Sequence, residues 1–161
     1  MIVQPDPVFR EKMAVGEHNQ YLRLQLGSIS YLLPGTSGYN IEQRDNLVIN
    51  KSPEGNVAAW RTVRTARYPA YCLDATLRVT RHHHWYRAVF LEALPHAVGM
   101  VVDEVQLLPS AETTITPFIP LGLPPTHLGH LFSGAWVTGN QVMLVFEPKA
   151  FVSYLQSLGN V

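Results

Sequence analysis

Short apolar runs separated by turn residues fill most of the chain, and this pattern predicts a mainly β protein. Residues 21–33 read as a hairpin around Gly27–Ser28, and residues 132–146 as a hairpin around the tight turn Gly139–Asn140. Further strands are predicted over residues 41–50, 57–65, 68–74, 87–91 and 97–108. Many short strands at close spacing favour a barrel-type architecture.

One helix is predicted, at the C-terminal end of the chain. Pro148 suits the first helical position, Phe151, Leu155 and Leu158 recur on one face, and Gly159 suits the stop. Residues 109–125 are rich in Pro and Thr and predict a long loop with one short strand near residues 113–116.

The apolar run at residues 98–102 is followed directly by Asp103 and Glu104. A core strand that reaches two carboxylates must leave the interior there or bury them without partners. We therefore expect a strand that bends out to a rim, with Asp103 accepting local backbone hydrogen bonds at the bend. Glu104 is either an ordinary solvated residue or part of an acidic edge that docks a partner.

Composition and charge favour a compact protein with oriented contacts. The chain has 161 residues, of which 47% are hydrophobic and 15% charged, so it suits one domain or two small ones that share a core. Its formal net charge is zero, which does not favour bulk attraction to nucleic acid or an anionic membrane. Residues 58–87 hold six Arg against Asp74 alone, whereas acidic residues dominate from residue 88 onward. This asymmetry fits a protein contact, and nearly as well a solvated face.

Cysteine usage and the N-terminal sequence bear on compartment. The single Cys72 excludes an internal disulfide and a Cys-rich zinc site, and its apolar surroundings predict a buried thiol. Pro5, Asp6 and Pro7 interrupt the place where a signal peptide needs an apolar stretch. No apolar run approaches the roughly 20 residues of a membrane span. We expect a cytoplasmic protein without membrane insertion.

Three consecutive histidines at residues 82–84 are the candidate metal ligands. On a strand the first and third share a face, but two imidazoles make at most half of a tetrahedral zinc shell. An exposed connection between strands is the favoured interpretation, and no metal or cofactor is predicted. His96, His127 and His130 are expected at the surface or in loops.

Catalysis and nucleic-acid binding are weighed as alternatives. Ser110, Ser133 and Cys72 have no neighbouring base in a recognisable pattern, and no phosphate-binding glycine loop is present, so no enzymatic activity is predicted. The Arg-rich stretch over residues 60–87 carries five aromatic residues, as in barrels that bind single strands: Trp60, Tyr68, Tyr71, Trp85 and Tyr86. The same aromatics at strand spacing are more often core, and nucleic acid is not predicted as a partner.

With this layout, residues 20–158 resemble a CheW-like chemotaxis coupling domain. Residues 21–33 (YLRLQLGSISYLL) are similar to the family's opening hairpin, and residues 98–105 (VGMVVDEV) to its most recognisable strand. Residues 131–146 (LFSGAWVTGNQVMLVF) and 147–155 are similar to its closing hairpin and helix. Residues 1–19 are then an N-terminal extension to a single domain.

The chain departs from the family at its central signature, Gly-x-x-Asn-Leu-Arg-Gly followed by Pro-x-x-Asp-Leu. Anchored on Asp74, the alignment keeps only that Asp and places Ala66 where the family has a partner-binding Arg. Arg64 and Arg67 lie nearby, but a displaced guanidinium does not repeat the same bidentate geometry. Residues 35–40 also replace a stretch that tends to be helical and receptor-facing in the family.

The resemblance implies a mainly β fold of two SH3-like five-stranded β-barrel subdomains with a C-terminal α-helix, and no catalysis. It implies an adaptor that couples a receptor to a CheA-type histidine kinase in chemotaxis, phototaxis or type IV pilus motility. The alternative is a divergent module of the same fold that has lost receptor coupling and binds another protein. By resemblance, the partner-binding positions are Asn40, Ile41, Arg64, Ala66, Arg67, Val98, Gly99, Val101 and Gly134.

Overall fold

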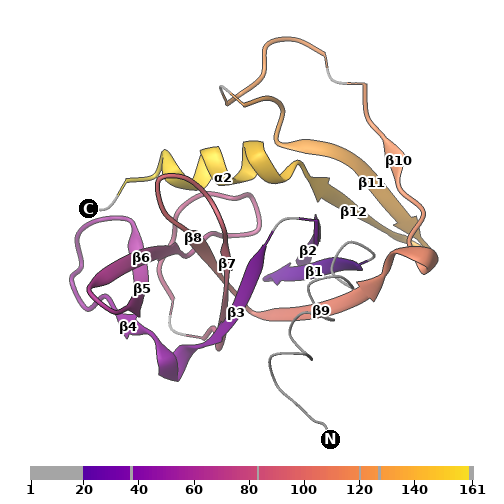
Figure 1. The fold of residues 1–161 in the computed structure, drawn as a ribbon. Helices are drawn as coiled ribbons and strands as arrows, with labels where there is room; N and C mark the ends of the chain where they lie inside the picture. Colours follow the sequence, from indigo (N-terminus) through magenta and orange to yellow (C-terminus); the bar gives the residue numbers. More distant parts are fainter. Residues whose placement is uncertain (1–19, 37, 83, 120, 127, 160–161) are drawn as a thin grey trace, which may run out of the picture.

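A computed structural model describes residues 20–36, 38–82, 84–119, 121–126 and 128–159, so the predicted N-terminal extension lies outside the described residues. The fold consists of two curled β-sheets and one C-terminal helix, α2 (Pro148–Gln156), which lies along one side of both sheets (Figure 1). The mainly β prediction and the C-terminal helix are confirmed.

Each sheet has six strands. Sheet A contains, in spatial order, β10 (Thr116–Pro117), β11 (Phe132–Thr138), β12 (Gln141–Phe146), β2 (Ile29–Pro34), β1 (Gln20–Leu26) and β9 (Glu104–Pro109). Sheet B contains β3 (Tyr39–Gln43), β7 (Arg87–Leu91), β8 (Val98–Val102), β6 (Ala66–Tyr71), β5 (Val57–Val63) and β4 (Val48–Ile49). Each sheet has six strands rather than the expected five because a two-residue strand forms at one edge, β10 in sheet A and β4 in sheet B.

The two edge strands of each sheet are consecutive along the chain, and this connectivity curls the sheets. In sheet B, β3 and β4 are joined only by residues 44–47, which include the 3-10 turn η1 (Arg44–Asn46). In sheet A, β9 and β10 are joined by residues 110–115, which include η2 (Ser110–Glu112). A short connection can bridge opposite edges of a six-stranded sheet only if the sheet bends round on itself. The chain passes from one sheet to the other twice, between β2 and β3 and between β8 and β9.

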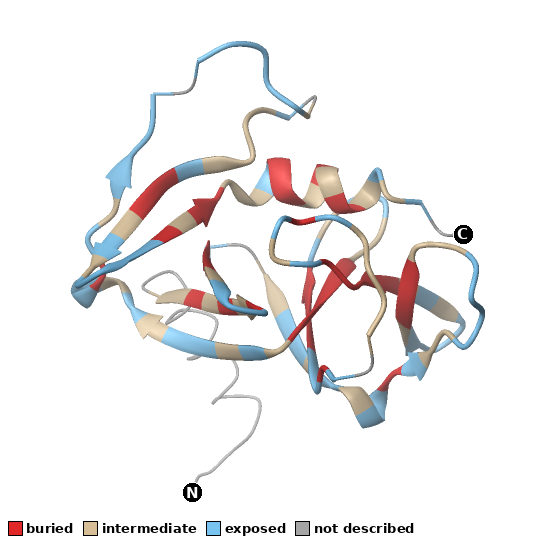
Figure 2. Ribbon diagram, turned by 180° about the vertical axis from the view of Figure 1, so that it is seen from behind, coloured by how far each residue is buried: buried red, intermediate tan, exposed pale blue. Residues whose placement is uncertain are grey.

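The two sheets share one hydrophobic core. In β1, Leu22, Leu24 and Leu26 are buried while the residues between them are partly exposed, which is the two-residue period of a strand with one covered face. All five residues of β8 are buried because both faces of that strand are covered (Figure 2). Burial of each such Leu or Val side chain stabilises the fold by roughly 1.5–3 kcal/mol.

Helix α2 closes the shared core. Pro148 occupies its first turn, and the Glu147 carboxylate accepts hydrogen bonds from the backbone N–H groups of Lys149 at 2.7 Å and Ala150 at 3.1 Å. These bonds satisfy donors that have no partner within the helix. Phe151 and Leu155 are buried on the inner face, as the sequence pattern predicts, and Gly159 has a positive φ of 79° after the last turn.

Several predicted strands have different bounds in the structure: the run over residues 57–65 ends at Val63, and the run over residues 97–108 is divided at Asp103 into β8 and β9. The run over residues 41–50 is interrupted by η1, and the run over residues 68–74 ends at Tyr71. The short strand expected near residues 113–116 forms at Thr116–Pro117 instead, because its partner β11 pairs Thr116 with Ala135 and Pro117 with Gly134. Sequence periodicity carries no information on such pairings between distant strands.

Candidate protein-binding surfaces

The crossing from sheet B to sheet A takes place at Asp103. The preceding strand β8 pairs with β7, whereas β9 pairs with β1. The Asp103 backbone N–H donates to the carbonyl of Gln25 at 2.9 Å, and its carboxylate accepts from the Gly27 N–H at 2.6 Å. The predicted exit from the interior is confirmed. The expectation that the accepted bonds are local is wrong, because the donor belongs to the β1–β2 turn.

A mixed polar and aromatic hollow of about 310 Å³ lies at this junction between the sheets. It is lined by Gln43, Tyr86, Arg87, Asp103 and Glu104. Its rim carries the exposed ring of Tyr86, which is 72% accessible. Tyr and Arg, here Tyr86 and Arg87, are residue types enriched in protein-binding surfaces.

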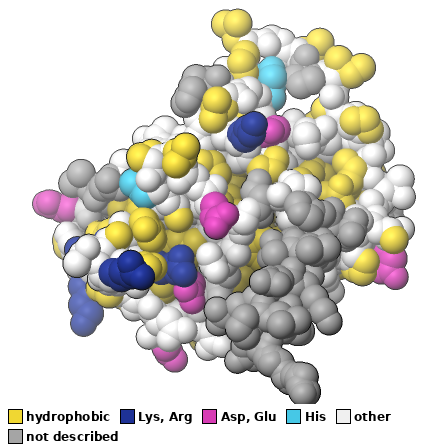
Figure 3. Space-filling view, viewed as in Figure 1, with side chains coloured by type: hydrophobic (Ala, Val, Ile, Leu, Met, Phe, Trp, Pro, Cys, Tyr) yellow, Lys and Arg dark blue, Asp and Glu magenta, His cyan; other side chains and the backbone are white. Residues whose placement is uncertain are grey.

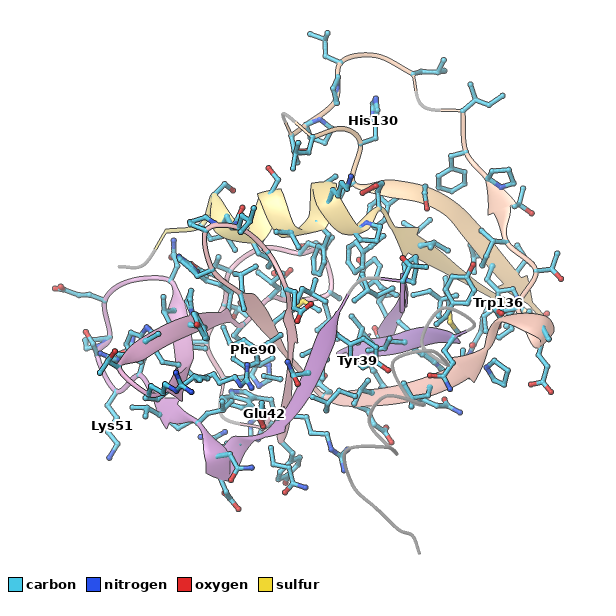
Figure 4. The ribbon with its side chains drawn as sticks, in the orientation of Figure 1. Tyr39, Glu42, Lys51, Phe90, His130 and Trp136 are labelled. Atoms are coloured by element: carbon cyan, nitrogen blue, oxygen red, sulfur yellow. The ribbon has the colours of Figure 1, made fainter. Side chains whose placement is uncertain are left out.

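Next to this hollow, the predicted residues Asn40 and Ile41 lie on the edge strand β3, and both are exposed. The neighbouring Glu42 forms an ion pair of 2.9 Å with Arg61 of β5, so β3 and β5 approach each other across the curled sheet. The Arg61 guanidinium lies 6.0 Å from the centroid of the Phe90 ring, and Phe90 belongs to a buried hydrophobic cluster within sheet B. Figure 4 labels Glu42 and Phe90, on the neighbouring strands β3 and β7. The ion pair and the ring contact hold Arg61 in place.

The β5–β6 turn carries the predicted residues Arg64, Ala66 and Arg67. Arg64 has a positive φ of 57° and is exposed, and Ala66 is half-buried at the start of β6. The Arg67 guanidinium lies 4.1 Å from the centroid of the Trp60 ring, a cation–π contact. The structure thus places these three residues together at the β5–β6 turn, whereas Asn40 and Ile41 lie on the edge strand β3.

The remaining predicted residues are buried. Val98 and Val101 are no more than 1% accessible, so a partner cannot touch their side chains. A Cβ on Gly99 would lie 2.6 Å from the Phe90 ring, and one on Gly134 would lie 2.5 Å from the Thr116 carbonyl oxygen. These two glycines are needed for close packing. Substitutions at these four positions therefore change binding only by changing the shape of the sheets.

The loop at residues 72–80 follows β6 of sheet B and is hydrogen-bonded to sheet A and to helix α2. The Asp74 carboxylate accepts hydrogen bonds from the Thr76 hydroxyl at 2.7 Å and from the backbone N–H groups of Thr76 and Arg78, which turns the chain after β6. These bonds, with that from Thr76 as the largest contribution, lower the pKa of Asp74. The Tyr31 hydroxyl donates to the Ala75 carbonyl at 2.6 Å, and the Tyr154 hydroxyl donates to the Leu77 carbonyl. Burial raises the pKa of both phenols, and the Asp74 charge adds to that effect.

The described residues contain no group of three or more metal-ligating side chains. The rings of His82 and His84 stack on each other with centroids 5.9 Å apart, in an irregular connection before β7. His96 stacks on Tyr68, and His130 is half-buried in the loop before β11 (Figure 4). His83 and His127 lie outside the described residues.

Burial also bears on Cys72 as a candidate nucleophile and on the aromatic residues as a candidate nucleic-acid surface. Cys72 is buried, as predicted, and burial raises the pKa of its thiol. Tyr71 and Trp85 are no more than 2% accessible, so neither ring can stack on a nucleotide base. The core interpretation of these two aromatics is confirmed. No helix within the described ranges is long and apolar enough to cross a bilayer.

The sequence pattern does not predict two of the exposed surfaces. The junction hollow depends on Tyr86, which in the sequence is one of several aromatic residues in a basic stretch. The loop before β11 carries strongly exposed apolar side chains, among them Ile119, Leu121 and Leu123. The sequence signal for this second surface was present: no Asp, Glu, Lys or Arg occurs between Glu112 and Glu147.

No known family model matches the chain, and no curated protein matches it. Among solved structures, the scaffolding protein TtCheW from Thermoanaerobacter tengcongensis is similar, with a TM-score of 0.57 and 18% sequence identity. The match covers 80% of this chain and 88% of that protein. At this identity the likeness concerns the fold alone. The two curled sheets and the C-terminal helix therefore form a CheW-like fold.

Proposed function

We propose that this protein is a non-catalytic cytoplasmic adaptor that couples a chemoreceptor to a CheA-type histidine kinase in chemotaxis, phototaxis or type IV pilus motility. The observation that carries the proposal is the CheW-like pair of curled sheets with an exposed hollow at their junction. The similar structure is described as a scaffolding protein. The adaptor needs no cofactor, since its task is to hold two proteins together.

The junction hollow is the proposed contact surface. It is lined by Gln43 of the edge strand β3, and Asn40 and Ile41 of the same strand are exposed. In the hollow, Tyr86 offers a large apolar ring, and Arg87 and Glu104 offer charges of both signs. Exposed aromatics of this kind supply most of the energy of protein interfaces, while charged neighbours orient the partner.

The test is a calorimetric titration of the protein with the CheA-type kinase of the same organism. We expect micromolar affinity for the wild type and a loss of about tenfold for Tyr86→Ala, equivalent to roughly 1.4 kcal/mol. Val142→Ala is the matched control, because Val142 is also strongly exposed, at 61% against 72% for Tyr86, but lies at the tip of the β11–β12 hairpin. No association of the wild type, or equal losses in both variants, counts against the proposal.

The second candidate is a CheW-fold module that has lost receptor coupling and binds another protein. It is favoured by Ala66 at the start of β6, where the family resemblance implies an Arg, and by Arg67, whose guanidinium already lies over Trp60. Ala66→Arg separates the candidates. If the missing Arg had weakened coupling, the variant binds kinase or receptor more tightly than the wild type, whereas an unchanged affinity supports the adaptor as it stands.

A further inference from the structure

The loop between β10 and β11 presents an apolar edge to solvent. Its side chains at positions 119, 121 and 123 are 89%, 89% and 94% accessible, and Phe118 and Leu128 are about half exposed. The loop projects away from both sheets (Figure 1), and hydrophobic side chains line it in the space-filling view (Figure 3). Exposed apolar patches of this kind mark interaction sites in folded proteins.

An apolar hollow of about 330 Å³ lies at the foot of the same loop. Leu128 borders it on the loop side and Val152 on helix α2. Leu91 at the end of β7 and Leu94 in the turn after it complete the apolar lining. The Gln156 side chain donates to the Leu94 carbonyl at 2.9 Å, which holds that turn against the helix. Leu94 is 90% accessible, so the hollow has an apolar rim as well as an apolar floor.

We propose that the loop of one molecule docks into this hollow on a second copy of the same chain, and that the second loop docks reciprocally. The projecting side chains and the hollow are neighbours that meet at Leu128, so one two-fold axis near Leu128 pairs each loop with the opposite hollow. The loop and the hollow's lining together supply roughly the 20 residues per side that a stable interface uses.

Charge decides between this occupant and the main alternative, a lipid surface. Amphipathic segments that bind anionic membranes combine apolar residues with Lys or Arg. The stretch between Glu112 and Glu147 contains neither, and the hollow is lined by one residue of each charge, Lys149 and Glu92. An uncharged loop and an apolar hollow with one charge of each sign match each other better than they match a charged partner.

Sedimentation velocity on the purified chain, with no kinase or receptor present, tests the dimer independently of the adaptor proposal. At about 100 µM, above the micromolar constants of weak interfaces, the wild type sediments with twice the mass of one chain. Leu123→Asp on the loop and Leu94→Asp at the hollow each return it to the monomer, and both positions are exposed enough to leave folding intact. Val137→Asp, on the exposed hairpin, is the control that remains dimeric.

Mixing separates reciprocal docking from general stickiness. An equimolar mixture of the Leu123→Asp and Leu94→Asp variants keeps one intact loop–hollow contact of the two, so it associates more strongly than either variant alone. Separately, a bismaleimide cross-linker is applied to mixed Leu123→Cys and Val152→Cys chains, since buried Cys72 is shielded. More cross-linked dimer in the mixture than in either chain alone supports the proposal. A monomeric wild type, or no gain on mixing, overturns it.

Discussion

The carboxylate of Asp103 accepts a hydrogen bond of 2.6 Å from the backbone N–H of Gly27, 76 positions earlier in the chain. Gly27 has a positive φ of 61° in the β1–β2 turn, a conformation that favours glycine. The bond ties the point where the chain leaves sheet B to a turn of sheet A. It therefore fixes how the two sheets meet at the junction hollow.

Removing this acceptor destabilises the fold. Asp103→Ala is expected to lower the free energy of unfolding by about 1 kcal/mol, because the Gly27 N–H loses its partner. Asp103→Asn loses less, since its amide oxygen still accepts. Urea denaturation measures both. Glu104→Gln is the control, with an expected change below about 0.5 kcal/mol because Glu104 is exposed. An Asp103→Ala variant as stable as the control contradicts this assignment.

Gly99 is required by the ring of Phe90. Gly99→Ala places a methyl group 2.6 Å from that ring and is expected to cost about 1–3 kcal/mol of stability through overpacking. Phe90→Leu provides space, so in the double variant the cost of Gly99→Ala falls. A double-mutant cycle by thermal or urea unfolding measures this coupling. Strictly additive losses would show that the two residues do not press on each other.

The family resemblance implies that Gly99 and Gly134 bind partners. In the structure both are buried and closely packed, which a local sequence pattern does not reveal. Local patterns do predict the secondary structure. Apolar runs predict the strands, the Gly139–Asn140 turn predicts a hairpin, and Pro148 predicts the start of the helix. The bend at Asp103 was also predicted, because two carboxylates cannot continue a buried strand. Which distant group satisfies Asp103 could not be predicted, since that partner is set by how two sheets pack.

Acid should weaken the loop that joins the sheets. The hydrogen bonds from Thr76 and Arg78 lower the pKa of Asp74 from its ordinary value of 3.8. The folded-state pKa is the lower one, so this stabilisation is complete above the unfolded value and is lost as pH falls through the folded-state pKa. Asp74→Asn keeps the acceptor oxygen but not the charge.

We therefore expect the free energy of unfolding of Asp74→Asn to fall less steeply below pH 3.8 than that of the wild type. Urea titrations at a series of pH values measure the two slopes. Glu54→Gln, at an exposed carboxylate, serves as the control and follows the wild-type curve. Identical slopes for Asp74→Asn and wild type rule out a contribution from Asp74.

The thiol of Cys72 is protected in the folded protein. Burial raises its pKa and covers the sulfur, so iodoacetamide should label it at a rate limited by opening of the fold. In urea above the unfolding midpoint, labelling becomes as fast as for a free peptide thiol. The Val137→Cys variant, with a thiol on the exposed β11–β12 hairpin, labels rapidly without urea. Rapid labelling of native Cys72 is the contrary result.

The candidate surfaces were harder to predict than the strands for a physical reason. Trp85 and Tyr86 are adjacent aromatic residues in the sequence, yet Trp85 is buried and Tyr86 is 72% accessible. The difference arises because Arg44 donates its backbone N–H to the Tyr86 carbonyl and its guanidinium covers the Trp85 ring. The antiparallel pairing of β3 with β7, which sets Gln43 opposite Arg87, brings residue 44 to this place.

Coupling requires that receptor and kinase bind the protein at the same time, and co-sedimentation with receptor-containing membranes measures this directly. Kinase and membranes are mixed with and without the protein, then pelleted, and the kinase in the pellet is quantified. The adaptor account predicts that the protein raises the pelleted kinase severalfold and that Tyr86→Ala reduces this gain. Equal amounts of pelleted kinase with and without the protein contradict it.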